Sequence, residues 1–152
     1  MPESPVVRRA LASDAEAVAE VWLRSFAAAL PTVRIVHSDD QVRDWLRRVV
    51  IGTLESWVIT ISDLVIGIMA LDDVDVDQLY LDPQWCGRKL GDRLIEQAKL
   101  RRPNGLGLWT FQVNGPALRF YARHGFTEVT RTDGARNDEH EPDVRLEWRP
   151  ST

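Results

Sequence analysis

The segment from residue 82 to residue 93 combines glycine with positive charge in a way that could bind a phosphorylated ligand. It follows a predicted strand and opens a predicted helix, and the unpaired N–H groups at a helix start attract anions. Gly87 and Gly91 would let the backbone approach a phosphate closely. Three cations add positive charge: Arg88, Lys89 and Arg93. The spacing matches neither a Walker loop nor a dinucleotide GxGxxG pattern, so a plain strand–turn–helix connection with solvated cations is an equally good interpretation.

Acidic residues alternate just before this segment. Asp73, Asp75 and Asp77 would share one face of a strand. The pattern is similar to a calcium loop, but Gln78 stands at the required glycine position and Gln84 at the required glutamate position. We therefore exclude calcium and predict no metal site.

The strands that must position these residues are predicted from β-branched and apolar runs bounded by turn residues. They cover residues 6–11, 57–61, 64–71, 74–81, 106–113, 127–132 and 144–148. Ser62 and Asp63 form the turn of a hairpin, and the three strands from residue 57 to residue 81 are apolar enough to be central in a sheet.

Four helices are predicted from apolar residues at helical spacing and from end signals. They cover residues 13–30, 38–51, 90–102 and 114–124. The first two begin with capping boxes, Ser13 with Glu16 and Ser38 with Gln41. The second helix is expected to bury a stripe made of Val42, Trp45, Leu46 and Val49.

The predicted order of elements is β-α-α-β-β-β-α-β-α-β-β, which indicates an α/β fold with a mixed sheet. The chain has 152 residues, which fits a single domain over residues 1–152.

Several short stretches in this order carry a family resemblance. They are Asp77–Pro83, Gly87–Gly91, Asn114–Tyr121 and His124–Phe126. Together with the order of elements, they resemble the GCN5-related N-acetyltransferase (GNAT) family over nearly the whole chain. The resemblance implies a GNAT-like fold and an acyl-CoA-dependent N-acetyltransferase that uses acetyl-CoA as its acyl donor.

The family holds the CoA pyrophosphate with backbone amides of a loop motif, Arg/Gln-x-x-Gly-x-Gly/Ala. Here Cys86 stands where Arg or Gln is usual, Lys89 stands where Gly is usual, and Gly91 matches. If position 89 needs a positive φ, a lysine there costs about 1 kcal/mol. The residues that the resemblance implies for acetyl-CoA are Leu79, Tyr80, Leu81, Gly87, Arg88, Lys89, Leu90, Gly91, Asp92 and Asn114.

The resemblance also implies catalytic roles. Tyr121 matches the tyrosine that protonates the departing CoA thiolate; the alternative is that it packs in the core beside Phe120. Asp77 lies nearest the bulge expected in its strand and is the candidate general base, directly or through water. His37 and His124 are weaker candidates for the base. Transfer in the family is direct, so we expect Cys86 to be a small half-buried residue and not a nucleophile.

The acceptor pocket of the family lies between the first two helices and the last strands. The residues expected there are Trp22, Phe26, His37 and Trp109, with Arg34, Arg43, Trp45 and the polar loop 137–141 nearby. Aromatic and acidic groups together suit a cationic amine, so the expected acceptor is a primary amine of a small molecule or peptide.

Composition limits the other classes of function. The net charge of −4 and the absence of a basic stripe argue against nucleic acid, and no apolar stretch is long enough for a membrane span. The chain has one cysteine and no signal-peptide pattern, which predicts a cytoplasmic location. Family members are often homodimers, so a homodimer is left open. Two alternatives also stay open: an acyl-CoA-binding protein without transferase activity, and a GNAT-fold enzyme with other chemistry.

Overall fold

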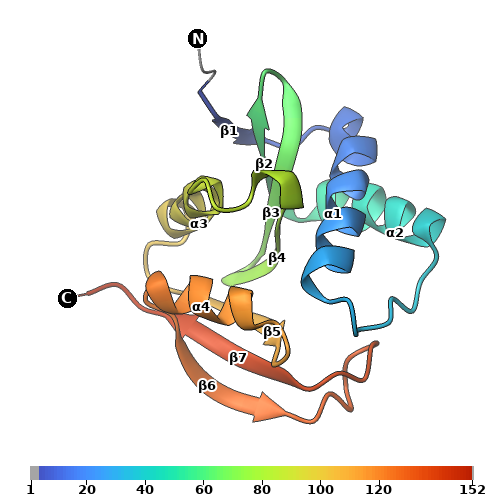
Figure 1. Cartoon of the computed structure of the whole chain (residues 1–152). Coiled ribbons are helices and arrows are strands. Elements are labelled where there is room, and N and C mark those ends of the chain that lie inside the picture. Colours follow the sequence, from blue (N-terminus) through green and yellow to red (C-terminus); the bar gives the residue numbers. More distant parts are fainter. Residues whose placement is uncertain (1–3, 152) are drawn as a thin grey trace.

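A computed structural model describes residues 4–151, and within them the backbone forms a seven-stranded mixed sheet (Figure 1). The strands run in the spatial order β1-β2-β3-β4-β5-β7-β6. Their bounds are β1 Val6–Arg9, β2 Glu55–Ile61, β3 Leu64–Asp72, β4 Asp75–Leu81, β5 Leu106–Phe111, β6 Thr127–Thr132 and β7 Asp143–Trp148. Neighbouring strands are antiparallel except for β4 and β5, which are parallel. The predicted order of elements and the predicted mixed sheet are confirmed.

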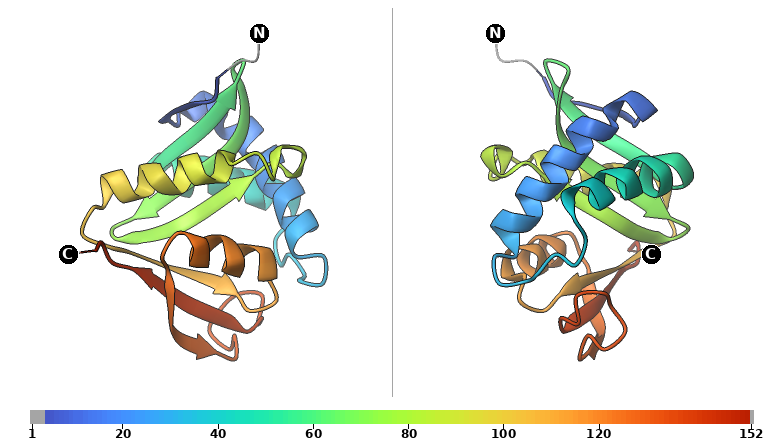
Figure 2. Two further views of the ribbon diagram at one scale, coloured as in Figure 1. Left: turned by 60° about the vertical axis from the view of Figure 1, so that its left-hand side comes forward. Right: turned by 90° about the vertical axis from the view of Figure 1, so that its right-hand side faces the viewer.

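Helices cover both faces of this sheet (Figure 2). Their bounds are α1 Ala15–Ala29, α2 Asp39–Trp45, α3 Leu90–Arg101 and α4 Gly115–Arg123. One apolar cluster joins α1 and α2 to one face, around residues such as Val18, Leu46 and Ile68. The other cluster joins α3 and α4 to the opposite face, around Leu94, Leu108 and Tyr121. The sheet is therefore buried on both sides, which explains the long apolar runs in its central strands.

The sheet divides where β4 meets β5. Among the described residues, the pairing between these two strands is limited to Asp75 with Gly107. The Arg145 guanidinium on β7 lies over this point and donates to both carboxylate oxygens of Asp75, each at 2.8 Å. A Cβ on Gly107 would lie 2.0 Å from that guanidinium, so only glycine leaves room for the ion pair. Beyond it the strands diverge, and the edge of β4 that faces β5 carries no partner strand over residues 77–81.

A bulge in β4 falls at Asp77. Ala70 pairs with Gln78 and Leu71 pairs with Val76, so Asp77 has no partner on β3. The expected bulge is therefore present. The prediction that three aspartates share one strand face is wrong for Asp73, because it lies in the turn before β4 with φ 52°.

Two predicted helix details are also corrected. The helix α1 begins after a short 3-10 turn, Ala12–Asp14, so Ser13 lies inside that turn and does not cap the helix, whereas the Ser38–Gln41 capping box is present. Residues 46–51 form a π-helical turn. Its wider spacing turns Val49 outward and buries Val50 instead, so the predicted stripe shifts by one residue.

Candidate functional site

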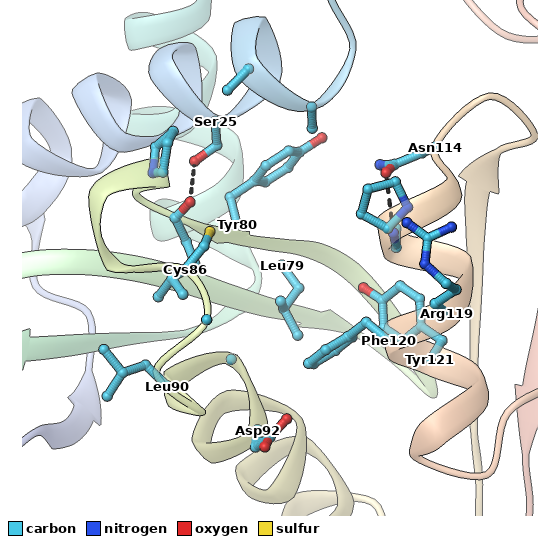
Figure 3. A pocket seen from close by; sticks show the side chains of 18 of the residues that line it. Ser25, Leu79, Tyr80, Cys86, Leu90, Asp92, Asn114, Arg119, Phe120 and Tyr121 are labelled. Atoms are coloured by element: carbon cyan, nitrogen blue, oxygen red, sulfur yellow. Dashed lines mark hydrogen bonds between the residues drawn. The ribbon is translucent and has the colours of Figure 1, made fainter.

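A pocket of about 610 Å³ lies along the free edge of β4, between this strand and α4 (Figure 3). We call it the larger pocket. Its walls come from the end of α1, from β4 and the loop after it, from the start of α3 and from α4. The residues that line it are Ser25, Ala28, Ala29, Leu79, Tyr80, Leu81, Pro83, Cys86, Gly87, Lys89, Leu90, Gly91, Asp92, Asn114, Pro116, Ala117, Arg119, Phe120, Tyr121 and Arg123.

Side-chain contacts anchor the β4 end of the loop between β4 and α3. The buried carboxylate of Asp82 accepts hydrogen bonds from the Gln84 N–H at 3.1 Å and from the Arg24 guanidinium at 2.6 Å. Ser25 donates its hydroxyl to the Leu81 carbonyl at 2.6 Å (Figure 3). The helix α1 therefore holds the end of β4, and the loop begins from a fixed point.

Two left-handed residues shape the loop itself. Gly87 has φ 81° and Lys89 has φ 63°, immediately before α3 begins at Leu90. Position 89 thus has the conformation that glycine adopts most easily, and lysine costs about 1 kcal/mol there. Successive backbone N–H groups in a turn of this kind can point toward one place, which is the geometry of a concave anion site.

Gly91 lies in the first turn of α3, beside an aromatic ring of α4. A Cβ at this position would lie 3.2 Å from Phe120 Cε1, so the missing side chain allows α4 to pack closely on α3. Gly91 also lines the larger pocket, so its expected approach to a phosphate stays a prediction.

Positive charge gathers on the larger pocket although the chain is acidic overall. Lys89 comes from the loop, and Arg119 and Arg123 come from α4. Sequence reasoning missed both arginines. Their spacing of four residues places them on one face of α4, which is the signal that could have found them. The acid among the lining residues, Asp92, contacts His124 Nε2 at 2.8 Å, so this histidine joins α3 to α4.

The Tyr121 side chain extends from α4 into the larger pocket, with its hydroxyl toward Leu79 (Figure 3). Its ring packs against Phe120 and Phe126 at centroid distances of 5.2 and 5.3 Å. The ring is therefore part of the core, and the hydroxyl still reaches the pocket. Burial raises the pKa of the phenol above its ordinary value of 10.0, so the group keeps its proton in neutral solution.

A second pocket, of about 300 Å³, lies on the other side of Tyr80. We call it the smaller pocket. Its lining residues are Trp22, Phe26, Leu30, Trp45, Asp77, Gln78, Tyr80, Trp109, Thr110, Phe111, Asn114, Asn137, Glu139 and Asp143. Of the residues predicted for the acceptor, it brings together Trp22, Phe26 and Trp109, together with Trp45, Asn137 and Glu139, which were expected nearby. Phe111 on β5 and Asp143 on β7 also line it, and the sequence analysis did not name them.

The smaller pocket is acidic. Its three carboxylates belong to Asp77, Glu139 and Asp143, and its lining includes no Lys, Arg or His among the described residues. Asp143 accepts a hydrogen bond from the Asn137 amide at 3.2 Å, which fixes the loop over the pocket without neutralising its charge. Burial, followed by the charges of Glu139 and Asp77, raises the pKa of the Tyr80 phenol above 10.0. The negative charges of these carboxylates therefore extend into the interior of the smaller pocket.

Tyr80 and Asn114 line both pockets. The side chain of Asn114 caps α4 by accepting from the Ala117 N–H at 3.2 Å (Figure 3). Tyr80 packs on Trp22 with ring centroids 5.6 Å apart. The two pockets therefore meet at these residues, beside the bulge of β4.

Two of the predicted site residues, Arg88 and His37, line neither pocket. Arg88 does not line the larger pocket, and its guanidinium lies 4.9 Å from the centre of the Trp85 ring. His37 does not line the smaller pocket, and its Nε2 lies 3.5 Å from the carboxylate of Asp138. Cys86 lines the larger pocket and is exposed, not half-buried as expected. Partial desolvation and then the charge of Asp82 raise the pKa of its thiol above 9.0, which disfavours the thiolate.

Comparison with known proteins identifies the family. The model of the acetyltransferase (GNAT) domain matches residues 53–128, which covers β2 to the start of β6 and includes the loop, α3 and α4. The chain therefore belongs to the GNAT acetyltransferase family and is an acyltransferase.

Two curated relatives carry a more specific name. The peptidyl-lysine N-acetyltransferase YjaB of Salmonella typhimurium is 28% identical over 131 residues, which cover 84% of this chain and 86% of the relative. The peptidyl-lysine N-acetyltransferase YiaC of Escherichia coli is 26% identical over 122 residues, which cover 80% of this chain and 82% of the relative.

Solved structures show the same fold. The apo form of YjaB from Escherichia coli has a TM-score of 0.81 at 23% identity and covers 97% of this chain and 99% of its own. The PaiA N-acetyltransferase of Thermoplasma acidophilum, solved with coenzyme A, has a TM-score of 0.72 at 19% identity and covers 97% of this chain and 99% of its own. Among the described residues of this chain, the helices are too short or too polar to cross a membrane.

Proposed function

We propose that the protein transfers an acetyl group from acetyl-CoA to a primary amine. The observation that carries this proposal is the junction of the two pockets at Tyr80 and Asn114. One pocket has cations and a glycine-containing loop, and the other has carboxylates and aromatic rings. A donor with phosphates and an acceptor with an ammonium group would meet where the pockets meet.

The larger pocket fits acetyl-CoA in volume and in chemistry. Its volume of about 610 Å³ lies in the usual range for a cofactor site. The N–H groups between Gly87 and Asp92 would hold the pyrophosphate, with Lys89, Arg119 and Arg123 adding positive charge. The free edge of β4 at residues 79–81 would hydrogen-bond the pantetheine arm and polarise the thioester carbonyl. The structure of PaiA with coenzyme A supports this assignment by fold.

The chemistry needs few groups. The neutral amine nitrogen attacks the thioester carbon, the C–S bond breaks, and the sulfur leaves with the bonding electron pair. Tyr121 would donate its proton to that sulfur, because burial keeps its hydroxyl protonated until the thiolate forms. Asp77 would accept the proton from the amine, directly or through water. The products are an amide and the CoA thiol.

The smaller pocket favours an alkyl ammonium group as the acceptor. Aromatic faces attract cations, and three carboxylates add a negative field. A free amino acid would bring its own carboxylate into that field and would be repelled. We therefore propose the lysine side chain of a peptide, or a small amine that resembles it. The names of the two curated relatives support this choice.

The experiment that tests the proposal is a thiol-release assay with acetyl-CoA and a panel of amines. We expect CoA release with a lysine-containing peptide or an alkyl diamine and little release with free amino acids. Mass spectrometry of the amine should show one added acetyl group. If thiol release depends on no amine in the panel, the proposal is wrong.

Asp77→Asn tests the proton acceptor separately. We expect a large loss of turnover and a pH–rate profile that no longer shows its acidic limb, because the amide cannot accept a proton. A profile of unchanged shape would contradict the role of Asp77.

Several further points stay predictions of the sequence. They are the single domain over residues 1–152, the cytoplasmic location and the possibility of a homodimer.

A further inference from the structure

A chain of two hydrogen bonds runs from the core to the carboxylate of Asp77. The indole Nε1 of Trp22 donates to Gln78 Oε1 at 3.0 Å. The amide Nε2 of Gln78 then donates to Asp77 Oδ2 at 3.1 Å. All three side chains line the smaller pocket.

The first bond decides how the Gln78 amide is oriented. An indole N–H is only a donor, so it requires the carbonyl oxygen of the glutamine to face it. The NH₂ group of the same amide must then point the other way, toward Asp77. Reversal of the amide would leave the indole without an acceptor and would turn a carbonyl oxygen toward a carboxylate.

Trp22 can direct this amide because its ring cannot move. The side chain is 7% exposed. It packs against three aromatic rings, Phe26, Trp45 and Tyr80, at centroid distances of 5.1, 5.9 and 5.6 Å. The indole N–H is therefore a fixed donor at the wall of the smaller pocket.

Asp77 needs such a contact more than an ordinary strand residue does. It is the bulged residue of β4 and is exposed, so neither a partner on β3 nor packing restricts its side chain. Its neighbour Gln78 pairs with Ala70, so the backbone of the glutamine is fixed by the sheet. The amide of Gln78 is the contact that holds the carboxylate toward the pocket.

We propose that Gln78, oriented by Trp22, is a positioning residue that aims the Asp77 carboxylate at the acceptor amine. The inference rests on the proposed function, because it explains what holds Asp77, the group that would receive the proton from the amine, in position.

Gln78→Met tests this directly, since it keeps much of the side-chain volume and removes the amide. We expect kcat/KM for the amine to fall about tenfold, the factor that corresponds to one hydrogen bond to a charged group. The KM for acetyl-CoA should stay unchanged. Trp22→Phe should act in the same direction, and the double variant should be no worse than Gln78→Met alone, because both changes break one chain of contacts.

The decisive measurement is Gln78→Met in an Asp77→Asn background. If Gln78 acts through Asp77, the second change has little further effect there. An equal tenfold loss in both backgrounds would overturn the proposal. Failure of the proposed function has a separate signature, because the wild type would then release no CoA with any amine.

Trp57→Phe is the matched control for the tryptophan. Its indole also donates to a side chain, the Glu55 carboxylate at 3.0 Å, but this residue lies on β2 and lines neither pocket. We expect its kcat/KM for the amine to equal that of the wild type. An equal loss in both tryptophan variants would show a general effect of removing an indole and would also overturn the proposal.

Discussion

The two pockets share a wall but carry opposite charge. The larger pocket has Lys89, Arg119 and Arg123 against one acid, whereas the smaller pocket has three carboxylates and no cation among the described residues. A chain with a net charge of −4 has thus placed opposite charges on the two sides of a wall that contains Tyr80 and Asn114. The difference teaches that local potential, and not the net charge, decides which ligand a protein selects.

The supports of the two pockets also differ. The larger pocket depends on backbone conformation, with φ 81° at Gly87 and φ 63° at Lys89. The smaller pocket depends on side chains, namely packed aromatic rings and the contacts that hold Asp77. Substitutions should therefore separate the two: changes of conformation or of α4 charge affect the donor, and changes of aromatic or acidic side chains affect the acceptor.

Tyr121→Phe should give the largest effect. We expect turnover to fall about 100-fold, because general acid catalysis contributes at least that much in many enzymes. The phenyl ring keeps the packing with Phe120 and Phe126, so the acetyl-CoA dissociation constant and the melting temperature should barely change. Steady-state kinetics and calorimetric titration provide these values. An unchanged turnover number would remove the role of the hydroxyl.

The double variant Arg119→Met, Arg123→Met should come next. Removing two cations from the larger pocket should weaken acetyl-CoA binding about tenfold at low salt and flatten its salt dependence. The KM for the amine should stay the same. A matched control is Arg47→Met, whose guanidinium pairs with Asp44 at 3.2 Å and lies outside both pockets.

Glu139→Gln is the corresponding test of the smaller pocket, because it removes one of the carboxylates there. It should raise the KM for the amine severalfold and leave acetyl-CoA affinity unchanged. If either variant changed both constants equally, the separation of charge between the pockets would not govern binding.

Lys89→Gly should give the smallest effect, and that effect should be on stability. Glycine adopts the left-handed conformation freely, so we expect the free energy of unfolding to rise by about 1 kcal/mol. Urea denaturation measures this change. Arg88→Gly is the neighbouring control and should stabilise nothing, because position 88 has no positive φ to relieve.

Acetyl-CoA titration of the same Lys89 variant sharpens the comparison. We expect the wild type to bind and the variant to bind no more than moderately better. Tight binding by the variant with no detectable binding by the wild type would show that Lys89 blocks the larger pocket.

Much of the fold could be predicted from the sequence because local patterns specify local structure. Alternation and apolar runs located all seven strands, and end signals located the four helices to within a few residues. The exceptions have local causes. The π-helical turn at residues 46–51 changes the helical period, and the bulge at Asp77, which only the family resemblance led us to expect, changes the period of a strand. Neither irregularity leaves a clear mark in a pattern of hydrophobic residues.

The sequence by itself determined the order of elements, the family resemblance, and the loop and tyrosine that the larger pocket uses. Only the tertiary structure decided that Arg119 and Arg123 face that pocket, that Gly91 makes room for Phe120, and that Trp22 reaches Asp77 through Gln78. The physical reason is the separation along the sequence of the residues that interact. Helix caps, strands and turns depend on neighbours a few residues away, whereas the Trp22–Gln78 contact joins residues 56 positions apart and exists only when α1 packs on β4.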